Sequence, residues 1–288
     1  MINYIIYFLL NVFSFILACL PRKIVLYIGK SFGFLMYYIF PLRKRVAFKN
    51  LQIAFPNKNK KSINKIILKS YMHYGLIMME FVRNAIASVK EKNYNIDDKT
   101  IDILNNSQSL IFMTAHIGNW EMVIPIISKY KKMMVVVRDQ NNSGGDKFFY
   151  KARKYNNVKL ISKKGSKKSM LKSLYDDYVL TLASDQNAKS KGVKIDFFGV
   201  PASIPKGAGH FHAISKAKIV VGFVMLNQNL KYDFKLNYIN IEDKIEQKEE
   251  LIVKVNKIYV QMLEKAILKN PEQYFWFHKK WDKDIYSN

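Results

Sequence analysis

The alternation of apolar runs with helix-like segments constrains the fold of this 288-residue chain more than any other feature. Five apolar runs typical of buried strands occupy its middle part, at 109–115, 133–137, 158–161, 178–183 and 219–226. Segments with helical spacing separate most of these runs, as at 166–176 and 206–216. This order predicts an α/β fold, with a central, largely parallel or mixed sheet flanked by helices.

Three further segments extend this prediction on either side of the alternating region. Apolar residues recur at steps of three and four over 61–86, which predicts a long helix. Residues 232–241 read as a strand at an edge of the sheet, and 246–269 as a long amphipathic helix. We therefore expect two long helices to accompany the sheet.

The N-terminal segment indicates attachment to a membrane. Residues 2–20 carry no charged side chain, and their length approaches that of a membrane-spanning helix. A cleaved signal peptide would need Lys or Arg before the apolar core, and none is present, which favours an uncleaved N-terminal anchor. A second apolar stretch, 24–42, is interrupted by Lys30 and ends in the basic cluster 43–45. We place the boundary between anchor and body after residue 42, and the pattern leaves open whether the anchor crosses the bilayer or lies in its surface.

The net charge of +25 predicts an anionic partner. Nucleic acid, acidic lipids and an acidic protein are all such partners. The chain contains no recognised nucleic-acid-binding module and has an N-terminal apolar segment, which argues against nucleic acid. Lysine supplies nearly all of the excess positive charge, and a high lysine content is partly a consequence of an AT-rich genome. The single cysteine, Cys19, excludes an internal disulfide and a thiolate metal cluster.

A histidine and a glutamate follow the first of the predicted strands. His116 lies just beyond the run 109–115, at the edge of a sheet where ligands bind in α/β folds, and Glu121 follows five residues later. Histidine suits proton transfer near neutral pH, and a carboxylate can orient its ring. Because no serine or cysteine nucleophile is nearby, the pair predicts a base that activates a hydroxyl of the substrate. The alternative is a structural histidine beside an ordinary acid in the first turn of a helix.

Other polar residues also stand at the ends of predicted strands. Arg138 is a candidate for binding a phosphate or an oxyanion, although a surface salt bridge explains it equally well. Asp185 and Gln186 are candidates for contact with the substrate. Lys163 and Lys164 precede a predicted helix and are candidates for binding an anionic group, or else belong to a solvated loop.

Four pieces of the sequence together resemble a known family. They are His-x-Gly-x-Trp-Glu at 116–121, Asp-Gln followed by Phe-Phe-Gly-x-Pro-Ala at 185–202, Pro-Glu-Gln-Tyr-x-Trp-x-His-Lys-Lys at 271–280, and the segment 45–56. In this order they are similar to the bacterial lipid A biosynthesis acyltransferases, the late lauroyl and myristoyl transferases of Gram-negative bacteria. The resemblance covers nearly the whole chain.

This resemblance implies an inner-membrane enzyme whose catalytic domain, 43–288, lies on the cytoplasmic side. Such an enzyme transfers a fatty acyl chain from an acyl carrier protein thioester to a hydroxyl of a lipid A precursor, with no cofactor and no metal. The histidine and the acid of the family correspond to His116 and Glu121. Lys279 and Lys280 replace two arginines found in many members, a change that weakens bidentate phosphate contacts.

The mechanism expected from these residues needs no covalent acyl-enzyme. His116 takes the proton of the acceptor hydroxyl, Glu121 orients its ring, and the main-chain N–H groups of Gly118 and Asn119, or Arg138, hold the oxyanion. Two alternatives remain open: an acyltransferase for another membrane glycolipid or phospholipid, and a non-catalytic membrane protein that binds anionic lipid.

Overall fold

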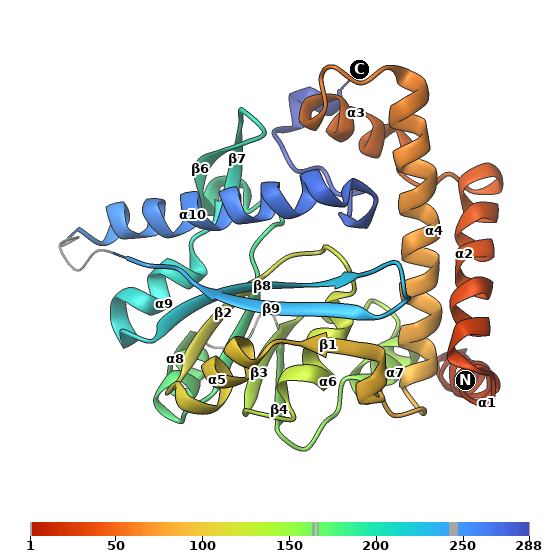
Figure 1. Cartoon of the computed structure of the whole chain (residues 1–288), viewed down its shortest axis with the longest axis horizontal. Coiled ribbons are helices and arrows are strands. Elements are labelled where there is room, and N and C mark those ends of the chain that lie inside the picture. The colour runs from red at the N-terminus through yellow and green to blue at the C-terminus, as the bar shows by residue number, and fades with distance from the viewer. Residues whose placement is uncertain (1, 163–164, 166, 242–246, 288) are drawn as a thin grey trace.

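A computed structural model describes residues 2–162, 165, 167–241 and 247–287. Its core is a seven-stranded sheet in the order β1-β9-β8-β2-β5-β3-β4 (Figure 1). The strands are β1 (Tyr94–Ile96), β2 (Leu110–Thr114), β3 (Met133–Val137), β4 (Val158–Ser162), β5 (Val179–Ala183), β8 (Lys218–Leu226) and β9 (Tyr232–Tyr238). Neighbours are parallel except for β8 and β9, which confirms the predicted α/β fold with a mixed, largely parallel sheet.

Helices cover both faces of the sheet, which explains why the central strands are apolar along their whole length. All five residues of β2 are buried, and they alternate between the two faces. One face packs against α8 (Lys167–Tyr175), α9 (Gly207–Ser215) and α10 (Lys248–Lys269). The other packs against α5 (Asp98–Asn106) and α6 (Val123–Ile127). The sheet is thus the middle layer of three.

The position of β9 corrects one prediction. Residues 232–241 were expected at an edge of the sheet, but β1 pairs with β9 on its outer side. β1 has only three residues and lies in a polar stretch, so it carries no periodic pattern that reveals a strand. The hairpin of β6 (Gly192–Phe197) and β7 (Val200–Pro205), which forms a separate two-stranded sheet, was not predicted either.

Four helices precede the sheet: α1 (Ile2–Cys19), α2 (Arg22–Ile39), α3 (Lys44–Ala54) and α4 (Lys60–Asn84). Glycines let α2 approach α4 closely. A Cβ atom on Gly33 would lie 2.1 Å from the carbonyl oxygen of Tyr71, and one on Gly75 would lie 2.2 Å from that of Gly29. Small residues thus bring the two helices together, while Val25 and Leu26 of α2 are also buried against the body.

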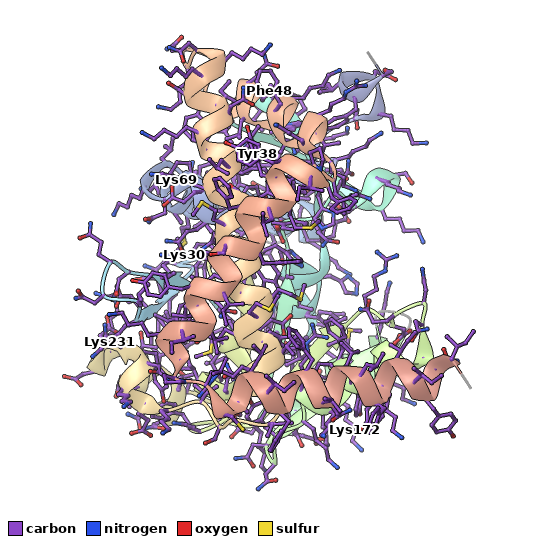
Figure 2. The ribbon with its side chains drawn as sticks, turned by 90° about the vertical axis from the view of Figure 1, so that its right-hand side faces the viewer. Lys30, Tyr38, Phe48, Lys69, Lys172 and Lys231 are labelled. Atoms are coloured by element: carbon purple, nitrogen blue, oxygen red, sulfur yellow. The ribbon has the colours of Figure 1, made fainter. Side chains whose placement is uncertain are left out.

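The outer faces of α1 and α2 are apolar and exposed. Within the described part of the chain, α1 is the helix that is long and apolar enough to cross a membrane alone, while α2 and α3 qualify only together, with a 99° bend between them. Both helices lie on one side of the molecule, which faces the viewer in Figure 2. The exposed apolar surface of α1 is consistent with the predicted N-terminal membrane-anchoring helix.

The remaining helical elements are short or peripheral. One is α7 (Ser143–Ala152), which packs against α1. The others are the 3₁₀ turns η1 (Glu91–Asn93), η2 (Trp120–Met122), η3 (Lys189–Lys191), η4 (Pro271–Gln273) and η5 (Lys283–Tyr286).

Candidate active site

The pairing of β2 with β5 brings His116 and Asp185 together. Thr114 and Ala183 are register partners at the carboxyl ends of these parallel neighbours. His116 and Asp185 each follow two residues later, so they leave the same edge of the sheet side by side. The His116 Nδ1 atom lies 2.8 Å from Asp185 Oδ1, a charge-assisted hydrogen bond when the carboxyl is ionised.

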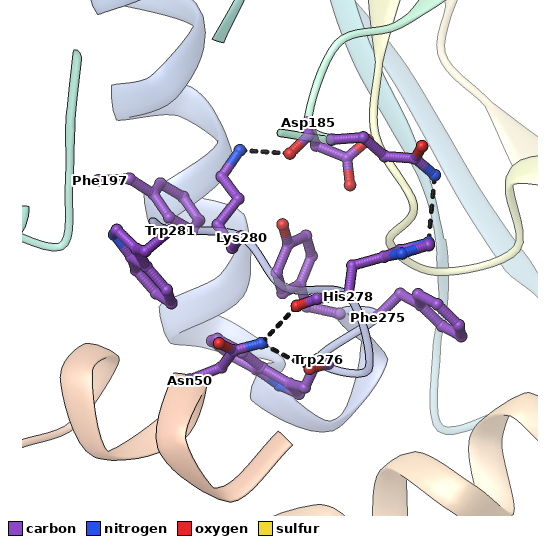
Figure 3. A pocket seen from close by; sticks show the side chains of 10 residues that line it. Asn50, Asp185, Phe197, Phe275, Trp276, His278, Lys280 and Trp281 are labelled. Carbon is purple, nitrogen blue, oxygen red and sulfur yellow. Dashed lines mark hydrogen bonds between the residues drawn. The ribbon is translucent and has the colours of Figure 1, made fainter. Parts of the chain in front are cut away.

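The surroundings of Asp185 keep its carboxyl ionised. Burial by itself raises the pKa of this group, but the adjacent His116 ring and the Lys280 ammonium outweigh burial and lower the pKa to about 2. The Lys280 Nζ atom donates to the main-chain oxygen of Asp185 (Figure 3). Burial lowers the pKa of Lys280 to about 8, with Asp185 opposing the shift. An ionised Asp185 accepts a hydrogen bond from the N–H at Nδ1 of His116, which places the lone pair of the neutral ring on Nε2.

A glutamine and a second histidine face the Nε2 side of His116. The Gln186 amide nitrogen lies 3.3 Å from Nε2 of His116 and 3.1 Å from Nε2 of His278. A carboxamide NH₂ group has two hydrogens, so one can be donated to each ring. Burial, together with the charge of His116, lowers the pKa of His278 to about 4, and this ring is therefore neutral at physiological pH.

The C-terminal segment that carries His278 is fixed to α3. The side-chain nitrogen of Asn50 donates to the main-chain oxygens of Trp276 and His278 at 2.6 and 2.7 Å (Figure 3). A narrow recess lies between this segment and the strand ends. Its lining residues are Asn50, Asp185, Gln186, Phe197, Tyr274, Phe275, Trp276, His278, Lys280 and Trp281.

Glu121 was predicted to orient His116, but its hydrogen bonds in the described residues go to Arg153 and Trp120. Its two carboxylate oxygens accept from Arg153, at 2.8 Å from Nε and 2.6 Å from Nη2. The Trp120 indole nitrogen adds a third hydrogen bond of 3.1 Å. The 3₁₀ turn Trp120–Met122 aims Glu121 at the end of α7, and Asp185 takes the place beside His116.

The main-chain N–H groups of Gly118 and Asn119 are already engaged, contrary to their predicted role at an oxyanion. The first donates to the carbonyl of Gln273 and the second to that of Val224, both at 2.8 Å. Gly118 has φ +59°, and a Cβ atom there would lie 1.9 Å from the Val224 oxygen. This glycine therefore lets the chain turn tightly against β8.

Comparison with known proteins identifies the family. The sequence model for the bacterial lipid A biosynthesis acyltransferases matches residues 1–283. The chain belongs to this family. It is 21% identical over 271 residues to the lipid A biosynthesis palmitoleoyltransferase of Escherichia coli K12, covering 91% of this chain and 86% of the relative. It is also 21% identical over 270 residues to a lipid A biosynthesis acyltransferase of Haemophilus influenzae, covering 92% of this chain and 86% of that protein.

In this lipid A acyltransferase, the side chain of Asn119 belongs to a buried hydrogen-bond network. Its side-chain nitrogen donates to the Tyr232 hydroxyl at 2.9 Å and to Glu80 at 3.3 Å. Glu80 also accepts from Tyr232 and from Arg22, the first residue of α2. The network therefore joins the loop after His116 to the start of α2.

The remaining predicted residues lie farther from His116 or cannot be placed. Arg138 is exposed beyond β3, near enough for its charge to contribute to the lowered pKa of His278. Lys163 and Lys164 lie outside the described residues. Within the described part of the acyltransferase, no group of three His, Cys, Asp or Glu side chains is arranged to hold a metal ion.

Sequence reasoning missed three residues near the site. His278 was quoted only as part of the motif at 271–280, and Lys280 only as a replacement for an arginine, yet Lys280 is buried against Asp185. Arg43 donates to the main-chain oxygen of Phe277 at 3.2 Å, and its charge also acts on His278. The available signal was the unusual density of polar and aromatic residues in 271–281.

Proposed function

We propose that this acyltransferase moves a fatty acyl chain from an acyl carrier protein thioester to a hydroxyl of a lipid A precursor, with His116 as the general base. One observation carries the proposal: Nδ1 of His116 is bound to a buried carboxylate at 2.8 Å, and its Nε2 faces a side-chain amide. The His116 side chain is 21% exposed, and that of Asp185 only 3%. An imidazole held in this way is oriented and still accessible to a substrate.

In the proposed reaction, the acceptor hydroxyl oxygen attacks the thioester carbonyl carbon while its proton passes to His116 Nε2. Asp185 stabilises the imidazolium that forms. The tetrahedral intermediate then expels the thiolate as the C–S bond breaks, and His116 returns the proton to the departing sulfur. No acyl group is bound to the protein at any step, since the thioester is already activated.

We assign the oxyanion contact to Gln186, because the amides of Gly118 and Asn119 already donate to main-chain carbonyls. An acceptor hydroxyl bound to His116 Nε2 replaces the hydrogen bond that the Gln186 NH₂ group makes to that atom over 3.3 Å. This exchange frees one N–H of Gln186 for the thioester carbonyl oxygen. The other N–H remains on the neutral His278 ring, which holds the amide at the site.

Glu121 keeps a role in this proposal, as a positioning residue. It accepts from the Trp120 indole, whose ring centroid lies 5.1 Å from that of His116. Arg153 fixes the Glu121 carboxylate by two hydrogen bonds. The ion pair thereby holds the indole against the catalytic ring.

Positive charge near the site suits both proposed substrates. Arg43 and Arg138 are exposed close to His278 and are placed to meet a phosphate of the acceptor. Lys163 and Lys164 remain candidates for contact with an acidic carrier protein. We assign membrane contact to 1–42 and catalysis to 43–288, with the catalytic domain on the cytoplasmic side of the inner membrane.

Product mass tests this function directly. The purified full chain in detergent micelles is incubated with an acyl carrier protein thioester and the lipid A precursor, and we expect the precursor to gain one acyl group. His116→Ala should lower the rate by about 10²–10⁴-fold, whereas His210→Ala on α9 should leave it unchanged.

Each other outcome favours a different function. Acylation of another glycolipid or phospholipid alone would support a sibling acyltransferase. Lipid binding without transfer to any acceptor would support a non-catalytic membrane protein.

A further inference from the structure

The first helix is docked along its length on the body of the protein. The Asn142 side chain, before α7, donates to Asn3 at 2.9 Å, and Lys151 donates to Asn11 at 2.7 Å. Farther along, the Ser14 hydroxyl donates to the main-chain oxygen of Val82 in α4 at 2.6 Å. These contacts extend from the first turn of α1 to its last turns.

The polar residues of α1 form a single stripe. Asn3, Tyr7, Asn11 and Ser14 follow one another at steps of four, four and three, which places them on one side of a helix. The Lys147 ammonium of α7 lies 4.7 Å from the centre of the Tyr7 ring. This polar stripe therefore faces α7 and α4.

The opposite side of α1 is uniformly apolar and exposed. Its exposed residues include Tyr4, Ile5, Phe8, Leu9, Val12, Phe13, Phe15 and Ile16. The neighbouring helix α2 adds Ile24, Tyr27, Ile28, Phe32, Phe34, Leu35, Tyr38 and Ile39. We call these two sets together the apolar face. An exposed face of this extent marks a contact with a partner or a membrane.

The two helices run in different directions over this face. Figure 2 shows α1 along the lower edge and α2 rising above it, both on the side toward the viewer. A plane that touches the exposed residues of both helices is parallel to both axes. When this face lies on a bilayer, both helix axes are parallel to the membrane plane. Neither helix then crosses the bilayer, as long as α1 stays docked.

Charge placement supports the same orientation. For α1 to cross a bilayer in its docked position, α7 would have to enter the hydrocarbon with Lys147, Lys151 and the adjacent Lys154. A lysine at the centre of a bilayer is unfavourable, because its charge leaves water for hydrocarbon. Lys30 also lies midway along α2, where an interfacial helix can extend its ammonium to the headgroups.

We infer that α1 and α2 lie in the plane of a single membrane leaflet, with the apolar face in its acyl chains, so that no part of α1 crosses the bilayer. With 18 residues, α1 is long enough to span a bilayer. Its docking on the body, rather than its length, therefore keeps it in the plane of the membrane. Beyond the apolar face, the exposed residues Phe40 and Leu42 lead directly to Arg43, which holds the segment of His278. The site therefore opens next to the leaflet, where an acyl chain of the acceptor can reach it.

A disulfide between α1 and α7 tests this inference in membranes. Cys19 is the only cysteine, so Cys19→Ser gives a cysteine-free background. Asn3→Cys and Asn142→Cys are introduced together, salt-washed membranes are oxidised with copper phenanthroline, and free thiols are counted by a mass-tagged maleimide. Asn142→Cys with Ser287→Cys is the control pair, because Figure 1 places the C-terminus and α7 at opposite ends of the molecule.

We expect the protein in the salt-washed membranes, with most of the 3/142 pair oxidised and the control pair still reduced. A 3/142 pair that stays as reduced as the control would overturn the inference, because residue 3 of a spanning helix lies on the far side of the bilayer. Protein absent from the membrane fraction would overturn it as well.

Labelling with a membrane-impermeant maleimide gives a second measure. Native Cys19 and a Cys at position 3 should be labelled from the same side of sealed vesicles, whereas a spanning helix exposes them on opposite sides. The inference rests on membrane association alone, and neither assay measures acyl transfer. Its failure is thus distinguishable from failure of the proposed function.

Discussion

Replacement of Asp185 by Asn should remove most of the activity by disabling His116. The 2.8 Å contact with His116 is a hydrogen bond to a charged group, worth about 1.5–3 kcal/mol, or roughly 10–150-fold in rate. In addition, the Asn side chain can donate to Nδ1, which moves the ring proton to Nε2 and blocks the base. Together these effects predict a loss of about 10²–10⁴-fold in kcat/KM.

The pH dependence of the residual activity separates Asp185 from Glu121. Without its carboxylate partner, the imidazolium of His116 is less stable, so the acid limb of kcat/KM should move to lower pH in Asp185→Asn. Glu121→Gln disturbs the pair with Arg153 and the position of Trp120, and it should lower the rate without moving this limb.

The assay is product mass against time from pH 5 to 9, with Asp102→Asn, an exposed change on α5, as the matched control. A limb that moves in Glu121→Gln and stays in place in Asp185→Asn would refute the reasoning. It would show that Glu121 is the carboxylate in contact with His116 during turnover.

Three further predictions concern the oxyanion, the second histidine and the packing of α2. Gln186→Leu should lower kcat about 10–1,000-fold with a smaller change in KM, measured in the same assay. A change in KM as large as the fall in kcat would contradict an oxyanion role. His278 has its pKa lowered to about 4, so between pH 6.5 and 4 the unfolded chain binds a proton that the folded one does not. As the pH falls over this range, the free energy of unfolding of the wild type should therefore decrease by up to about 2 kcal/mol more than that of His278→Gln, as measured by urea unfolding. The same dependence of this free energy on pH in both proteins would contradict the prediction. Gly75→Val should destabilise the protein by about 1–3 kcal/mol in thermal unfolding, because a Cβ atom at this position would lie 2.2 Å from the Gly29 carbonyl oxygen. Gly207→Ala is the control and should leave the stability unchanged, because the nearest atom to its Cβ is 3.7 Å away.

The fold was largely predictable because its central strands are buried on both faces. β2, β3 and β5 are short apolar runs separated by helices, a pattern that specifies a parallel sheet. β1 escaped prediction, because three residues in a polar stretch form a strand only through pairing with β9. Local sequence carries no information about such a partner.

The site was predictable residue by residue, but its contacts were not. His116 and Asp185 were both recognised at strand ends, yet only the β2–β5 register shows that they are neighbours. Spacing along the chain favoured Glu121, and the 3₁₀ turn that directs it to Arg153 has no clear sequence pattern. His278 reaches the site from the other end of the chain, a contact that tertiary packing alone creates.

Single-turnover mass measurement tests most directly whether His116 acts as a base on the acceptor hydroxyl. Enzyme in excess over the acyl thioester is quenched at intervals, and both the lipid product and the intact protein are weighed. We predict product with one added acyl group, unmodified protein at every time, and about 10²–10⁴-fold slower product formation in His116→Ala. An acylated protein that precedes the product, or a His116→Ala variant that transfers at the wild-type rate, would contradict the account.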